Sequence, residues 1–409
     1  MLSQIIKDKI QPSLKKLEFN KPLEAYRGLC ALLVILNHGM CHEDWFFKSF
    51  RFNEFLHYTN AGYLSVMVFF CMSGYVIGVT NNRATLNFTD YLKKRAIRLY
   101  PTYILSIILS LFVVQNLKLT SLAGNLFFLQ NSNSYFGFNV PIFVNGATWS
   151  LNYEVVYYLL FGIIFFMKPN VWLFCFFCLM ASIGLIHSNS AIAFIAHYLN
   201  GFAFWMIGLL FAWKKKGVSD VQSNFSSCKW SLLSLLFVHL CQNHLGLGMI
   251  IMNLTRISST NNFNWLFDLP FCIMILASLT STENLFIKIN KVFVYVAPGL
   301  LFIYLAFEKR IFENERWIMC LIFWILALLF YKERRVSEYL MFKLEWIGKI
   351  SYGVYILHEP IIFLIAKYLI INNLYLEIIL KYSLWLSITF ILAYFMEIKL
   401  QPKFKLIFK

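Results

Sequence analysis

Long apolar blocks, separated by short segments rich in lysine and arginine, run through the whole of this 409-residue chain. A helix needs about 20 mostly apolar residues to cross the hydrocarbon core of a bilayer. Blocks of that kind occupy residues 27–44, 61–80, 99–117, 147–167, 170–188, 191–213, 230–252, 264–281, 291–307, 316–331, 350–371 and 376–397. The pattern predicts an all-α polytopic membrane protein with twelve transmembrane helices. Ten is the alternative, because the blocks at 264–281, 291–307 and 316–331 are short.

The lysine and arginine residues predict the orientation of the chain, because short cytoplasmic loops carry an excess of positive charge. With the N-terminus in the cytoplasm and twelve alternating spans, 27 of the 36 basic residues fall on the cytoplasmic side and seven on the other. Both termini are therefore expected to be cytoplasmic. We expect three parts: a cytoplasmic N-terminal segment at 1–24, a membrane domain at 25–397 and a cytoplasmic basic tail at 398–409.

Composition narrows the class of protein further. Hydrophobic residues make up 59% of the chain and charged residues 14%, whereas soluble domains carry about 25% charged residues. The net charge of +16 does not indicate nucleic acid, because most basic residues lie between apolar blocks; membrane lipids are the expected partner. The N-terminal 21 residues have no long apolar core, so a cleaved signal peptide is not expected.

The cysteines give no sign of a metal site. Cys175 and Cys178 form the one close pair, and they lie within an apolar block without neighbouring histidines. Packing is therefore favoured over zinc or redox chemistry, and no metal is expected.

Two polar residues interrupt the first apolar block. Arg27 and His38 are eleven residues apart, which is about three helical turns, so both project from one helix face roughly 16 Å apart along the axis. Ionisable groups at membrane depth are costly and are functional candidates by default. The alternatives are a snorkelling anchor for Arg27 and an interhelical hydrogen bond for His38, but the shared face favours a joint role.

Small residues gather in the second block, in the stretch VFFCMSGYVIG at 68–78. Ser73, Gly74 and Gly78 lie on one side of the predicted helix. Spacing alone favours close helix packing of the small-xxx-small kind. The alternative is close approach of the backbone to a ligand.

A cationic stretch precedes the third block and contains Lys93, Lys94, Arg95 and Arg98. Arg95 and Arg98 are three residues apart, so they are neighbours on a helix. They would form either an anchor attracted to anionic lipid or a phosphate site, because arginine forks match phosphate oxygens. The sequence leaves both interpretations open.

Two further blocks hold carboxylates. Glu154 lies one helical turn beyond Ser150, and a buried carboxylate needs a partner or a proton. It would serve as a base, orient a histidine or belong to a structural ion pair. His358 and Glu359 lie within a late block just before Pro360, where either would line the same cavity or mark a local kink at the proline.

These stretches, in this order, resemble the acyltransferase-3 family of integral membrane O-acyltransferases. The matching motifs are Arg-x10-His at Arg27 and His38, Phe-Phe-x-x-Ser-Gly at 69–74, Arg-x-x-Arg at Arg95 and Arg98, Trp-Ser-Leu-x-x-Glu from Trp149 to Glu154, and Ile-Ser-Tyr-x-x-Tyr-x-x-His ending at His358. Five motifs in one order form a specific signal. Members of this family commonly have ten spans in the domain.

The resemblance implies transfer of an acyl group, often acetyl, from cytoplasmic acyl-CoA to a hydroxyl of an envelope glycan such as O-antigen or capsule, in the inner membrane of a bacterium. Acyl-CoA is then a co-substrate, and no bound cofactor is expected. His38 is the expected base, because histidine titrates near neutral pH and an alcohol must lose its proton to attack. Glu154 would orient His38 or balance its charge.

Binding roles are expected for the other motif residues. Arg95 and Arg98 would bind phosphate groups of the donor, and Arg27 would bind a further phosphate or balance Glu154.

Ser73 and Gly74 would let the pantetheine arm or the acyl group pass close to the backbone, with direct transfer favoured over a covalent intermediate. Trp149 and His358 complete the predicted substrate-binding set.

A proton-coupled transporter of a small solute or glycan precursor is the alternative function, since intramembrane Arg, His and Glu also suit a carrier. No inverted repeat and no matching pair of broken helices supports it. Consumption of acyl-CoA discriminates between the two functions.

Overall fold

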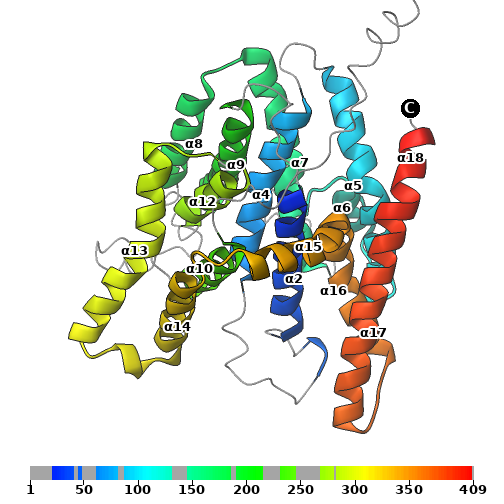
Figure 1. Ribbon diagram of the computed structural model, residues 1–409. Coiled ribbons are helices and arrows are strands. Elements are labelled where there is room, and N and C mark those ends of the chain that lie inside the picture. Colours follow the sequence, from blue (N-terminus) through cyan, green and yellow to red (C-terminus); the bar gives the residue numbers. More distant parts are fainter. Residues whose placement is uncertain are drawn as a thin grey trace, which may run out of the picture.

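Every regular element in the described part of this computed structural model is a helix (Figure 1). The structure describes residues 21–40, 45–47, 61–81, 87–130, 145–185, 190–214, 231–245, 268–280 and 282–407. The α-helices are α2 (Lys21–Met40), α4 (Gly62–Thr80), α5 (Phe88–Leu111), α6 (Leu119–Leu126), α7 (Trp149–Met167), α8 (Val171–Leu185), α9 (Ser190–Lys214), α10 (Leu232–Leu245), α12 (Leu269–Leu279), α13 (Leu285–Phe307), α14 (Glu315–Leu329), α15 (Arg335–Lys349), α16 (Ser351–Tyr368), α17 (Leu374–Tyr394) and α18 (Gln401–Ile407). Two 3-10 turns, η3 (Gly146–Thr148) and η7 (Ile311–Glu313), and one π-helical segment, η8 (Phe395–Leu400), complete the set. The predicted all-α class is confirmed.

A helix lies in each of the twelve apolar blocks, and the largest difference from prediction concerns α5. This helix begins at Phe88, eleven residues before the predicted block at 99–117. Asn87 caps the helix, because its side chain accepts hydrogen bonds from the backbone N–H groups of Thr89 and Asp90. The cationic stretch therefore forms the first turns of the same helix that continues into the apolar block.

Five helices among the described residues are long and apolar enough to cross a membrane, and six if the bent pair α15–α16 counts as one span. Helices α8, α10 and α12 are apolar but shorter. The molecule is a multi-pass membrane protein by this measure. The count of ten to twelve spans and the cytoplasmic side of the termini stay predictions.

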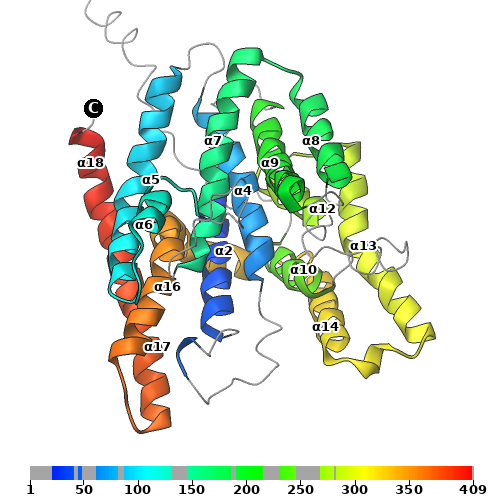
Figure 2. The ribbon, with the colours of Figure 1, turned by 180° about the vertical axis from the view of Figure 1, so that it is seen from behind.

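One end of the bundle gathers segments that the charge pattern assigns to the cytoplasm. Figure 1 and Figure 2 both place the start of α5, the α7–α8 connection and the C-terminal end of α18 at the same end. Residues Leu374–Ile407 form a continuous 34-residue helical run through α17, η8 and α18. The basic tail predicted at 398–409 is therefore helical as far as Ile407.

The connection predicted at 332–349 contains α15, which meets α16 at an angle of 69° and lies across α2 (Figure 1). The two backbones touch at glycines. A Cβ atom at Gly348 would lie 1.8 Å from the carbonyl oxygen of Glu24, and one at Gly28 would lie 2.5 Å from that of Leu344. This contact fixes the start of α2, where Arg27 lies.

Helices α4 and α9 also meet along glycines. A Cβ atom at Gly74 would lie 1.8 Å from the carbonyl oxygen of Trp205, and one at Gly208 would lie 1.8 Å from that of Cys71. At Gly78 a Cβ atom would lie 2.5 Å from the Cβ of Ala212. The helix-packing interpretation of the small residues in α4 therefore holds for Gly74 and Gly78, where the two helices approach closely.

Candidate active site

A cavity of about 660 Å³ lies between α2, α4, α5, α7, α16 and α18, a size typical of small-molecule sites. Its apolar lining includes Val66, Phe69, Phe70, Met72, Val76 and Leu151. The predicted site residues that line it are Arg27, Ser73, Arg95, Arg98 and Glu154. Four separate helices contribute these five side chains, so the fold brings together most of the motif residues.

The polar lining is strongly cationic, with six basic side chains and two carboxylates. Two of the cations have carboxylate partners: Arg27 lies 3.0 Å from Glu24, and Arg98 pairs with Glu397. The other four have no carboxylate within ion-pair distance in the described part of the chain; they are Lys93, Lys94, Arg95 and Lys405. We name these four side chains the cationic rim.

Arg95 and Arg98 have different surroundings although they are three residues apart on α5. The Arg95 guanidinium lies beside the rings of Tyr91 and Tyr158, with its Cζ 5.8 and 5.9 Å from the ring centroids. Its Nε is buried and makes no hydrogen bond within the described residues. Arg98 donates a hydrogen bond to Glu397. Arg95 therefore keeps a donor for a ligand, whereas Arg98 is engaged by the C-terminal helical run.

Glu154 projects from α7 into the cavity and accepts hydrogen bonds from two hydroxyl groups. Ser73 Oγ donates to Glu154 Oε1 over 2.7 Å, and the Tyr158 hydroxyl donates to the same oxygen. Neither bond involves a histidine, and the carboxylate within hydrogen-bond distance of His38 is Glu359 instead of Glu154. Gly74 faces α9 instead of the cavity, which corrects the prediction that it lets a ligand pass.

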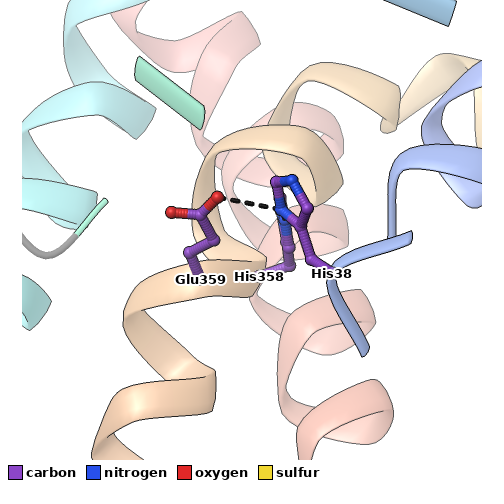
Figure 3. A group of neighbouring side chains, drawn as sticks. All are labelled: His38, His358 and Glu359. Atoms are coloured by element: carbon purple, nitrogen blue, oxygen red, sulfur yellow. Dashed lines mark hydrogen bonds and ion pairs between the residues drawn. The ribbon is translucent and has the colours of Figure 1, made fainter. Parts of the chain in front are cut away.

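His38, His358 and Glu359 form a second group of polar side chains, where the end of α2 meets α16 (Figure 3). The Nδ1 atom of His38 lies 2.8 Å from Glu359 Oε1 and 2.7 Å from His358 Nε2. His358 is completely buried and Glu359 nearly so, whereas the His38 side chain is 18% exposed. We name this group the histidine cluster; His38 is its accessible member.

Hydrogen bonds around His358 assign the tautomers of both rings. His358 Nδ1 lies 2.8 Å from the carbonyl oxygen of Tyr355, which can only accept, so Nδ1 carries the proton. In the neutral ring, His358 Nε2 is then an acceptor, and His38 Nδ1 must be the donor to it and to Glu359. A neutral His38 therefore has its basic lone pair on Nε2.

One turn of α16 connects the cavity to the histidine cluster. Tyr355 and Ile356 line the cavity, and His358 and Glu359 follow three residues later, about 4.5 Å along the helix axis. The hydroxyl of Tyr355 lies 2.8 Å from Ser150 Oγ, while its carbonyl oxygen accepts from His358. The cavity and the cluster thus share one wall.

The histidine cluster also has the composition of a metal site, because its three ligand atoms lie within 4.8 Å of one another. In a tetrahedral zinc site with bonds near 2.0 Å, neighbouring ligand atoms are roughly 3.3 Å apart. The separations of 2.7 and 2.8 Å from His38 Nδ1 are hydrogen-bond lengths instead. In this structure the three side chains are thus arranged as a hydrogen-bonded group.

Trp149 does not line the cavity, although its motif predicted a role in substrate binding. Its ring stacks on Tyr63 at 5.6 Å between centroids and meets Phe70 and Tyr153 edge to face. The side chain therefore contributes to an aromatic group that holds the start of α7 against α4.

The positions of two residues were not fully predicted from the sequence. Glu359 was expected to line a cavity or to mark a kink, but its pairing with His38, which joins segments more than 300 residues apart, was not predicted. Lys405 was assigned to the basic tail, yet it lines the cavity. The four-residue intervals between Glu397, Gln401 and Lys405 were the available signal, since such intervals place all three on one helix face.

Comparison with known proteins agrees with the resemblance drawn from the motifs. The chain is 30% identical over 121 residues to "Exopolysaccharide production protein ExoZ" of Rhizobium meliloti (strain 1021), a match that covers 28% of this chain and 38% of that relative. No solved structure gives a significant match. The model of the acyltransferase-3 family, described as an acyltransferase domain, matches residues 20–308. Because that match spans well over half of the chain and includes His38, Arg95 and Glu154, this protein belongs to the acyltransferase-3 family of membrane acyltransferases.

Proposed function

We propose that this membrane acyltransferase moves an acyl group, expected to be acetyl, from acyl-CoA to a hydroxyl group of an envelope polysaccharide, in the cytoplasmic membrane of a bacterium. One observation carries the proposal. His38 is held through Nδ1 by Glu359 and His358, and these two residues lie one turn of α16 from the wall of a cavity with six cationic side chains.

The cavity lining suits acyl-CoA as donor. The nucleotide half of this molecule bears a diphosphate and a ribose phosphate, which need cationic partners. Arg95 offers a fork of N–H donors, and Lys93 and Lys94 offer point charges beside it. The apolar side chains deeper in α4 would contact the pantetheine arm and a short acyl chain.

The proposed reaction is a direct transfer. Nε2 of His38 takes the proton of the acceptor hydroxyl while the hydroxyl oxygen attacks the thioester carbon. The new C–O bond forms, the C–S bond breaks, and the imidazolium returns the proton to the departing sulfur of CoA. Glu359 balances the positive charge on the ring and keeps Nδ1 protonated, the role that a carboxylate has beside the histidine of a catalytic triad.

The acceptor class is inferred from the relative and from the surroundings of His38. The relative's name refers to exopolysaccharide production. Beside His38 lies Trp45, with 5.3 Å between the ring centroids, and this indole would offer a flat apolar face to a sugar ring. Both observations support a polysaccharide hydroxyl as the acceptor.

Acylation of surface polysaccharide in cells tests the base assignment. Wild type and His38→Ala are expressed in a strain that lacks the gene, and acyl groups on the isolated polysaccharide are counted by mass spectrometry. We expect His38→Ala to abolish acylation at normal membrane levels, because no other group replaces the base. The matched control is His197→Ala, a histidine on α9 outside the cavity lining, which should leave acylation unchanged. Full acylation by His38→Ala would contradict the assignment.

Release of CoA by purified protein tests the reaction class. A transferase consumes acetyl-CoA when the polysaccharide acceptor is present, whereas a proton-coupled transporter does not. Wild-type protein that neither binds nor consumes acetyl-CoA would sink the proposed function and favour the transporter.

A further inference from the structure

The last helical run of the chain contributes a polar face to the donor cavity. Glu397, Gln401 and Lys405 follow one another at intervals of four residues along η8 and α18. This spacing places three side chains on one face of a helix. All three point toward α5 or the cavity beside it, as their contacts show.

Two of these side chains fasten the run to α5. Glu397, which is 7% exposed, pairs with Arg98 and accepts a hydrogen bond from Thr102 Oγ1 over 3.2 Å. The side-chain amide of Gln401, 4% exposed, donates to the carbonyl oxygen of Ile97 over 3.1 Å. Buried polar groups with such partners hold a fixed geometry. The run therefore lies against α5 as a wall, and Glu397 occupies a π-helical turn of the kind often found at functional sites.

The third side chain completes the cationic rim. Lys405 lines the cavity together with Lys93, Lys94 and Arg95 of α5. None of the four has a carboxylate within ion-pair distance in the part of the chain that the structure describes. Like charges that converge on one cavity repel each other unless an anion lies among them.

The partner chemistry follows from the position of the charges. Arg98 is neutralised by Glu397, so the charge available to an anion comes from α5 on one side and from Lys405 on the other. A ligand that satisfies both must place phosphate groups between α5 and α18. The buried Nε of Arg95, without a hydrogen-bond partner in the described residues, points to the same ligand.

We propose that Lys405 binds a phosphate group of the nucleotide half of acyl-CoA, so that α18 forms one side of the donor site. The inference rests on the proposed function, and it adds to that function a binding residue beyond the range of the family match, which ends at residue 308. The donor is held between the start of α5 and the end of α18, with its thioester directed toward Tyr355 and the histidine cluster.

The test compares two donors across matched variants. Binding of acetyl-CoA and of S-acetylpantetheine, which lacks the nucleotide half and all of its phosphate groups, is measured by isothermal titration calorimetry on purified full-length protein in zwitterionic nanodiscs. The variants are Lys405→Ala, Lys405→Arg and the control Lys403→Ala, a lysine of the same helix that does not line the cavity.

For Lys405→Ala we expect the Kd for acetyl-CoA to rise about five- to tenfold, as for a lost charge-assisted contact. The Kd for the truncated donor should stay within about twofold of wild type. Lys405→Arg should restore most of the affinity for acetyl-CoA, and Lys403→Ala should behave as wild type.

Three outcomes would overturn the inference. An unchanged Kd for acetyl-CoA in Lys405→Ala returns the lysine to the role of a surface charge. Equal losses for both donors show that Lys405 acts on the fold rather than on the nucleotide phosphates. An effect that appears only in nanodiscs with anionic phospholipid assigns the rim to a lipid headgroup. If wild-type protein binds acetyl-CoA in these cases, the proposed function is not affected. If wild-type protein does not bind acetyl-CoA, the proposed function itself is contradicted.

Discussion

The cationic rim and the histidine cluster hold their polar groups in opposite ways. Lys93, Lys94 and Lys405 of the rim are exposed and have no carboxylate partner among the described residues. In the cluster, His358 and Glu359 are buried, and both contact Nδ1 of His38. Unpaired exposed cations can adjust to a ligand, whereas buried hydrogen-bonded groups keep one geometry. Substitutions in the rim should therefore change donor binding, and substitutions in the cluster should change turnover.

The largest effect on turnover is expected for Glu359→Gln. The amide has no charge to balance an imidazolium and fixes the tautomer of His38 less firmly, so kcat should fall about 100-fold. The KM for acetyl-CoA should stay within about twofold, because Glu359 lies outside the cavity lining. Steady-state release of CoA measures both constants.

The matched control is Glu345→Gln, which alters a carboxylate paired with Lys349 on α15 at 2.8 Å. It should leave both constants unchanged. A raised KM with a normal kcat in Glu359→Gln would contradict the expected role of the histidine cluster in turnover, because the cluster would then act in donor binding.

An intermediate effect is expected in the rim, where Arg95→Ala should raise the KM for acetyl-CoA about tenfold with little change in kcat.

Arg98→Ala alters the same motif, but we expect it to lower the stability of the protein. The substitution leaves the buried Glu397 without its ion-pair partner. The free energy of unfolding, measured by thermal unfolding, should therefore fall by about 2 kcal/mol. This figure allows for the partial exposure of Arg98. Equal effects of the two variants on binding would show that both arginines contact the donor.

The smallest effect is expected for Ser73→Ala. The change removes one hydrogen bond to Glu154, worth about 1 kcal/mol, so kcat should fall no more than about threefold to fivefold. Complete loss of transfer, together with a trapped acyl group on wild-type Ser73 in peptide mass spectra, would replace direct transfer by a covalent relay.

The membrane helices could be predicted from the sequence because a spanning helix must satisfy its own backbone and present apolar residues to lipid. These demands are local, and a helix lies in each of the predicted blocks. The start of α5 was placed too late, since its first turns are cationic and hydropathy alone excludes them. Asn87 was the local signal that the helix begins earlier.

The candidate site was predictable only in part, because its contacts join distant segments. The motifs identified Arg27, Arg95 and Glu154, and these do line one cavity. Glu154 was predicted as the carboxylate beside His38, but the structure places Glu359 there. No local pattern in the sequence indicates which helix lies against α2. The sequence also does not show which face of α4 meets α9. Ser73 and Gly74 were therefore predicted to act together, whereas Ser73 lines the cavity and Gly74 contacts α9.

The glycine contact between α4 and α9 has a consequence for how the site can move. At Gly74 and Gly208 the backbone of each helix touches the other, so rotation of α4 about its own axis would drive carbonyl oxygens into the neighbouring chain. In a bilayer, where apolar side chains gain little by leaving lipid, such steric fit sets the rotational position of a helix. Ser73 therefore faces the cavity at one fixed angle.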